Sequence, residues 1–247
     1  MTALVLAVIA GAVVGLALGA LGGGGSVLAV PALIYLLGLT PAAATSAALI
    51  IVTATSATAL YAHTREGNVA WKTGALFAAA GIAPAFLAGA VAGRLSAAVL
   101  TAAFAAVAAL AAVRMLRPSA SEPPGRVRPG KAAGAGAGLG AVTGFLGVGG
   151  GFLAVPALVS VLGLRMRQAV GTSLLVITVN SLAALTARTG AGGGLPWEII
   201  GPFTGAAILG AWDGKRLAAK ISGTTLQKAF AGVLLAVATF MLVDVVV

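Results

Sequence analysis

Apolar residues run along this chain in long stretches that only short polar segments interrupt. Six stretches are predicted to be ordinary membrane-spanning helices, at about 44–62, 73–93, 95–113, 168–187, 197–212 and 222–243. A helix that crosses the hydrocarbon core of a bilayer needs roughly 20 predominantly apolar residues. The pattern therefore predicts an all-α integral membrane protein whose main partner is the lipid bilayer.

Composition points to the same class. Of 247 residues, 60% are hydrophobic and only 8% are charged, whereas a soluble domain carries roughly a quarter charged residues. The chain has no cysteine and one histidine, so we expect no disulfide, no metal site and no cofactor. The net charge of +10 comes from basic residues scattered between apolar runs, which is typical of a positive-inside bias rather than of nucleic-acid binding.

The chain contains two copies of one unit. Gly11–Leu39 and Gly136–Leu164 are identical at 17 of 29 positions and share the run LAVPAL. We therefore predict a first membrane repeat at 1–113 and a second at 132–247. The segment 114–131 is rich in Pro, Ser and Arg and is predicted to be an exposed linker.

Glycines spaced four residues apart mark the same place in both copies. They are Gly11, Gly15 and Gly19 in the first copy and Gly136, Gly140 and Gly144 in the second. This spacing puts them on one helix face, where a neighbouring helix can approach closely. The neighbour could belong to the same chain or to a second copy in a homodimer.

Basic residues discriminate between two topologies for the glycine-broken stretch that opens each repeat. If each stretch crosses the membrane once, the fifteen Lys and Arg residues divide eight against seven. If each folds back as a hairpin, they divide thirteen against two, the excess expected on the cytoplasmic side. The hairpin topology gives two inverted-topology repeats, each a re-entrant-like hairpin plus three transmembrane helices. The linker is then cytoplasmic, and both termini lie outside the cell membrane.

The hairpin tips are candidate anion-binding elements. They fall at Gly22–Ser26 and Gly147–Gly151. Irregular backbone is not tolerated against lipid, so each tip must pack in protein or line a wet cavity. Each tip opens a short helix whose first N–H groups are unpaired and carry the positive end of the helix dipole. Inverted symmetry would bring two such ends toward the midplane, where they could hold an anion.

Hydroxyl and amide side chains head the span that follows each hairpin. They are Thr45, Ser46, Thr53, Thr55 and Ser56 in the first repeat, and Thr172, Ser173, Thr178, Asn180 and Ser181 in the second. Such groups suit the oxygens of an oxyanion. Alternatively, the hydroxyls bond back to their own helix and the glycines serve packing alone. His63, next to a span end, is expected to be a solvated loop residue.

The order of these motifs, a glycine break, LAVPAL and a span headed by Thr-Ser, resembles the TauE/SafE family of sulfite and organosulfonate exporters. The resemblance extends from Gly11 to about Val243 and occurs twice. It implies export of small anions such as sulfite, sulfonates or related organic acids. A related thiosulfate-transporter group uses cysteines, which this chain lacks. The substrate-binding residues expected here are Gly22, Gly24, Gly25, Ser26, Thr45, Ser46, Gly147, Gly149, Gly150, Gly151, Thr172, Ser173 and Asn180.

Other functions remain open at this point. An anion channel, or a carrier of a small metabolite without sulfur, would use the same architecture, and a purely structural membrane partner is a further alternative. Ser26 with His63 as base could imitate an intramembrane serine protease, but the second copy has Gly151 in place of the serine. We therefore predict a transporter and no catalytic residue.

Overall fold

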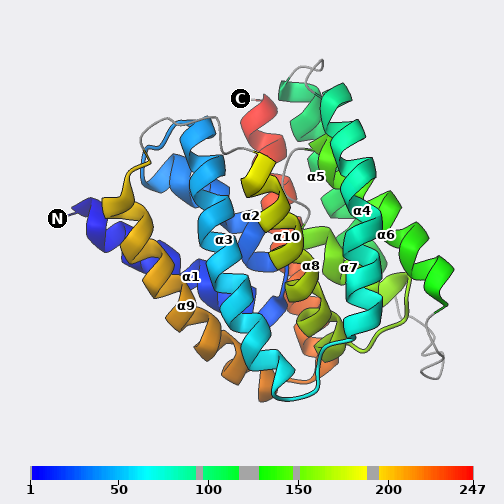
Figure 1. Cartoon of the computed structure of the whole chain (residues 1–247). Coiled ribbons are helices and arrows are strands. Elements are labelled where there is room, and N and C mark those ends of the chain that lie inside the picture. Colours follow the sequence, from blue (N-terminus) through cyan, green and yellow to red (C-terminus); the bar gives the residue numbers. More distant parts are fainter. Residues whose placement is uncertain (1, 93–96, 117–127, 147–150, 188–194, 247) are drawn as a thin grey trace.

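The computed structural model describes residues 2–92, 97–116, 128–146, 151–187 and 195–246 (Figure 1). Every regular element in these ranges is a helix. The elements are α1 (Thr2–Leu21), α2 (Gly24–Pro31), the π-helical η1 (Ala32–Leu36), α3 (Pro41–Thr64), α4 (Trp71–Ala92), α5 (Ala97–Leu116), α6 (Pro129–Leu146), α7 (Gly151–Ser160), α8 (Met166–Ala187), α9 (Trp197–Ala219) and α10 (Gly223–Val246).

The predicted all-α architecture is confirmed, and each of the six predicted spans corresponds to one helix. Within the described residues, five helices are long and apolar enough to cross a membrane: α1, α3, α4, α8 and α10. Helix α9 continues to Ala219, beyond the predicted end at residue 212. Hydropathy underestimates its length because the polar turn that carries Asp213 and Arg216, which pair at 3.5 Å, continues the helix.

The glycine face of α1 packs inside the chain. A Cβ added at Gly11, Gly15 or Gly19 would overlap the backbone of Phe203, Ala207 or Ala211 on α9, respectively. The residue numbers rise together on both helices, so α1 and α9 run parallel and side by side (Figure 1). The first glycine ladder therefore serves a helix contact between the two halves of the chain.

Each other long helix also pairs with a helix of the opposite half. Gly136 and Gly140 on α6 pack against Phe77 and Gly81 on α4, so these two helices are parallel as well. Helices α3 and α8 pack together and run antiparallel, because Ser56 meets Thr178 at 2.9 Å while Ala70, just after α3, reaches back to Thr172. Helix α5 packs against α10, and the amide of Gln227 at the start of α10 donates to the Met115 carbonyl near the end of α5.

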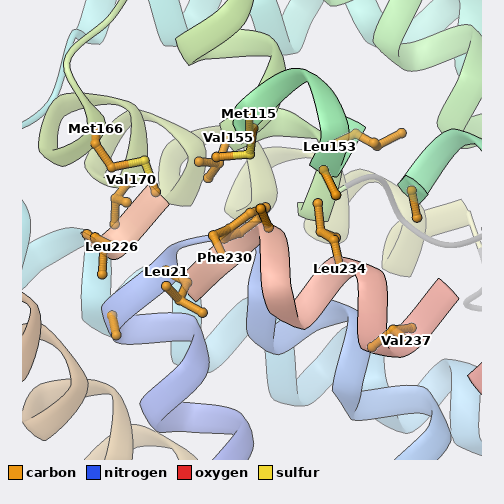
Figure 2. Packing of buried hydrophobic residues seen from close by; sticks show 14 of the residues in the cluster. Leu21, Met115, Leu153, Val155, Met166, Val170, Leu226, Phe230, Leu234 and Val237 are labelled. Atoms are coloured by element: carbon orange, nitrogen blue, oxygen red, sulfur yellow. The ribbon is translucent and has the colours of Figure 1, made fainter. Parts of the chain in front are cut away.

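The chain reverses direction between α1 and α2, as the hairpin topology predicts. Gly22 has φ +76°, a left-handed conformation that glycine adopts without steric cost. Gly25, in the first turn of α2, then packs against Leu18 and Val14 of α1. Leu21 lies beside this reversal in a buried cluster around Phe230, to which α1, α5, α7, α8, α9 and α10 contribute (Figure 2). The cluster thus holds the turn between α1 and α2 against helices of both halves.

Candidate functional site

The turn at Gly22 lies against the second half of the chain. A Cβ added at Gly22 would be 2.5 Å from the Ser173 hydroxyl oxygen, 3.1 Å from Val155 and 3.2 Å from the Val170 Cα. Ser173 is fully buried and donates to the Val170 carbonyl at 2.7 Å. The structure therefore brings together two predicted site residues that are 151 positions apart in the sequence.

Gly22 contacts a hydroxyl residue of the other half and lies far from those of its own half. Thr45 and Ser46 lie at the start of α3, whereas the end of α3 lies near Gly22. His63, beside the backbone of Gly19, is eighteen residues after Thr45, which is about 27 Å along a helix. Antiparallel pairing of α3 with α8 explains why Gly22 contacts Ser173, because it sets the end of α3 beside the start of α8.

The structure describes some of the other predicted tip residues. Gly24 and Ser26 belong to the first turn of α2, and Gly151 is buried at the start of α7. Gly147, Gly149 and Gly150 lie outside the described residues, as does the side chain of Ser26.

The Gly22 turn lies at the level of Ser173, which is the eighth residue of the 22-residue helix α8. The turn is therefore closer to the middle of α8 than to its first residue. The 20 residues of α1 span about 30 Å, so the first arm of the hairpin is as long as a full crossing.

Thr172 holds the connection between α3 and α4. Its hydroxyl oxygen accepts a hydrogen bond from the backbone N–H of Ala70 at 3.0 Å, and the side chain is fully buried. Gly171 next to it packs on the Asn68 carbonyl. The Thr172 hydroxyl thus makes a contact within the protein, and its ligand-binding role stays a prediction.

We expect Thr172→Val to destabilise the protein by about 1–3 kcal/mol, because the buried N–H of Ala70 would lose its acceptor. Thr172→Ser keeps the hydroxyl and should stay near the wild-type value. Thermal unfolding in detergent measures the difference. Equal stability of the valine and serine variants would show that the Ala70 bond contributes little.

A polar layer crosses the middle of the α3–α8 pair. Ser56 and Thr178 share a hydrogen bond of 2.9 Å. The Thr55 hydroxyl, 1% exposed, and the side-chain oxygen of Asn180 are buried without a hydrogen-bond partner. Asn180 follows Ser173 by seven residues, two helical turns, and so lies on the same face of α8. Polar groups without a hydrogen-bond partner, those of Thr55 and Asn180, therefore lie farther into the bundle than the Gly22 turn.

Several hydroxyls do bond back to their own helix, as the alternative interpretation expected. Thr53 donates to the Leu49 carbonyl at 2.6 Å, and Thr178 donates to the Leu174 carbonyl at 2.7 Å. These two hydroxyls cap helix carbonyls, while Thr55 and Asn180 remain the groups with capacity for a ligand.

A small pocket of about 20 Å³, open to the solvent on one side, lies beside the Gly22 turn. It lies where α1, α3 and α9 end and α8 and α10 begin, and its polar lining comprises His63, Glu66, Asn68, Arg167 and Lys215. The expectation that His63 is a solvated loop residue is wrong, since its side chain is only 5% exposed. Hydropathy ended the first predicted span at residue 62, whereas α3 continues to Thr64 and the packed end of α1 covers the ring. Within the described residues, no three His, Asp or Glu side chains gather to hold a metal ion.

Comparisons with known proteins agree with this architecture. The family described as "Sulfite exporter TauE/SafE" matches residues 7–241. Two curated proteins of Xylella fastidiosa, from strains 9a5c and Temecula1, are each 33% identical over 249 aligned positions, which cover 97% of this chain and 95% of the relative. Both are named "Probable membrane transporter protein". No solved structure matches the chain. With a family match over nearly its whole length, the chain belongs to the TauE/SafE family of membrane transporters.

Proposed function

We propose that this transporter exports small oxyanions, sulfite and sulfonates among them, and that the substrate binds between the Gly22 turn and the polar layer of α3 and α8. The observation that carries the proposal is the buried helix break at Gly22, which contacts Ser173 of the other half. The family description, which names sulfite, supports this substrate class.

The chemistry of the surrounding groups suits a small oxyanion. Helix α2 begins two residues after Gly22, and the first N–H groups of a helix have no acceptor within it and favour negative charge. The hydroxyl of Thr55 can donate to an anion oxygen, and the amide of Asn180 offers both a donor and an acceptor. A monoprotonated oxyanion carries both kinds of group, so it could both donate to the Asn180 oxygen and accept from a neighbouring hydroxyl.

Alternating access would follow from inverted repeats. Helices α3 and α8 occupy the same place in the two repeats, since Thr45-Ser46 corresponds to Thr172-Ser173, and they run in opposite directions. Helices α5 and α10, the last of each half, also pair with the start of one near the end of the other. These directions support inverted topology, in which one repeat moves against the other around a shared site.

In the proposed orientation, the His63 pocket opens on the cytoplasmic side of the membrane. Arg65, Arg167 and Lys215 lie at this end of the bundle, with Arg167 and Lys215 in the pocket itself. A cytoplasmic excess of basic residues is the general rule for membrane proteins. The linker at 114–131 is then cytoplasmic, the termini lie outside the cell, and substrate enters from the pocket side during export.

Flux of labelled sulfite, a sulfonate and a plain carboxylate into proteoliposomes tests the proposal. We expect saturable uptake of a sulfur oxyanion by the wild type, reduced at least tenfold in Ser173→Val and Asn180→Leu. Ser160→Ala, an exposed change at the end of α7, is the control and should transport normally. Flux that rises linearly with concentration, together with single-channel currents, would favour an anion channel instead. Absence of flux for all three anions would refute the proposal.

A further inference from the structure

We propose that the pocket around His63 is a second anion site, an entry site that binds the substrate before it reaches the Gly22 turn. The inference rests on the proposed function, because it assigns a role to a pocket next to that site. Neither the family match nor the relatives' names assign any role to these residues. The pocket combines a buried side chain without a hydrogen-bond partner, an excess of positive charge, and a lining residue that also contacts the Gly22 turn.

His63 is the unsatisfied side chain. It is 95% buried; the backbone of Gly19 lies close to the ring, but neither ring nitrogen makes a hydrogen bond of good geometry with the described residues. Buried polar groups in proteins nearly always have a partner, so one without any calls for a specific explanation. A neutral imidazole carries one donor and one acceptor. An oxyanion in the pocket would accept from the ring N–H, and a protonated one would also donate to the other nitrogen.

Charge in the pocket favours an anion. Lys215 and Arg167 contribute two positive charges against the single carboxylate of Glu66. Lys215 pairs with Glu66 at 2.7 Å and also donates to the Ala62 carbonyl at 2.6 Å, while Arg167 donates to the Ala219 carbonyl at 2.9 Å. Arg167 therefore has no carboxylate partner in the pocket. Since the side chain of Glu66 is 47% exposed, a substrate anion can compete with it for the Lys215 ammonium.

The pocket adjoins the proposed binding site. Ala20 and Val170 line it, and Val170 is also one of the residues that Gly22 contacts, at 3.2 Å from an added Cβ. Figure 2 shows Val170 and Leu226, another lining residue, at the same end of the Phe230 cluster as Leu21. An anion held at His63 is therefore separated from the Gly22 turn by little more than one layer of side chains.

A sided transport assay tests the entry site. Sulfite is presented to either face of the protein in proteoliposomes. The orientation of the protein is determined by labelling a single engineered cysteine, which the cysteine-free chain allows. We expect His63→Leu and Lys215→Gln to raise the KM at least fivefold for sulfite on the pocket face, with KM on the other face within twofold of the wild type. His63→Gln, which keeps a donor and an acceptor, should recover most of the loss. Lys228→Gln, an exposed change on α10, is the charge control and should behave as the wild type.

Labelling provides a measurement that needs no transport. A cysteine introduced as Asn68→Cys should react with a water-soluble maleimide, and sulfoacetate should slow that reaction at least threefold. The protection should disappear when His63→Leu is added. The entry site would be overturned if the His63→Leu and Lys215→Gln variants raised KM equally on both faces or on neither. It would also be overturned if sulfoacetate did not protect the cysteine. Failure of the proposed function is distinct, because it would appear as absent flux in the wild type whatever the labelling shows.

Discussion

Replacing Gly22 by alanine is expected to reduce transport at least tenfold while the protein still inserts in the membrane. Two effects combine at this position. The residue has φ +76°, a conformation that costs a non-glycine residue roughly 1–2 kcal/mol. The new Cβ would also lie 2.5 Å from the Ser173 hydroxyl oxygen and 3.1 Å from Val155, so the turn must move away from α7 and α8. That movement separates the two halves at the site that we propose binds the substrate.

Gly38→Ala is a matched control for this prediction. Gly38 has φ +68°, and a Cβ added there would meet no atom within 4 Å. The backbone penalty is therefore the same while the steric contact is absent. Flux of the two variants, measured at equal protein density, separates the causes. Equal loss in both would show that backbone strain alone explains the effect, and normal transport by Gly22→Ala would remove this turn from the site.

A double variant tests the contact itself. Adding Ser173→Ala to Gly22→Ala removes the hydroxyl oxygen that the new methyl group approaches most closely. We expect thermal stability to recover in part, because the remaining contacts with Val155 and Val170 are longer, whereas transport should stay low. Additive losses of stability in the double variant would mean that the two residues do not interact.

The sequence allowed the helices and their glycine faces to be predicted, but not the pairing of residues between the halves. Apolar length and the LAVPAL repeat depend on local pattern, and both reappear as helices of the expected kind. The partner of Gly22 depends on which helix packs across from it, and that is a property of tertiary structure. The predicted inverted topology favours such pairing, since it would set the end of one repeat's helix beside the start of its counterpart.

The His63 pocket could not be predicted for a related reason. A polar residue at the end of an apolar run is usually solvated, and hydropathy carries no information about which neighbouring helix covers it. The ring is buried because α1 ends beside it. Arg167 and Lys215 join the pocket from α8 and α9, more than one hundred residues farther along the chain. Only the folded bundle brings these charges to one place.

Gly15→Ala and Gly205→Ala should change stability in opposite directions. Alanine is favoured over glycine inside a helix by about 1 kcal/mol, so Gly205→Ala, where a Cβ meets no atom within 4 Å, should be neutral or stabilising. A Cβ at Gly15 would overlap the Ala207 carbonyl oxygen. Backbone atoms cannot rotate away, so α1 and α9 must separate along their whole contact. Overpacking of this kind costs about 1–3 kcal/mol or more, which exceeds the gain in helix propensity.

Heating each variant in detergent and measuring the fraction that remains monodisperse gives the midpoint of thermal inactivation. For a domain of this size, about 1 kcal/mol corresponds to roughly 2–4 °C. We therefore expect Gly15→Ala to lose several degrees and Gly205→Ala to lose none. The contrast depends on the parallel contact between α1 and α9, since both changes add the same methyl group to the same pair of helices. A stable Gly15→Ala would mean that the glycine ladder of α1 does not face α9, and the first hairpin would then lack the support that holds its turn against Ser173.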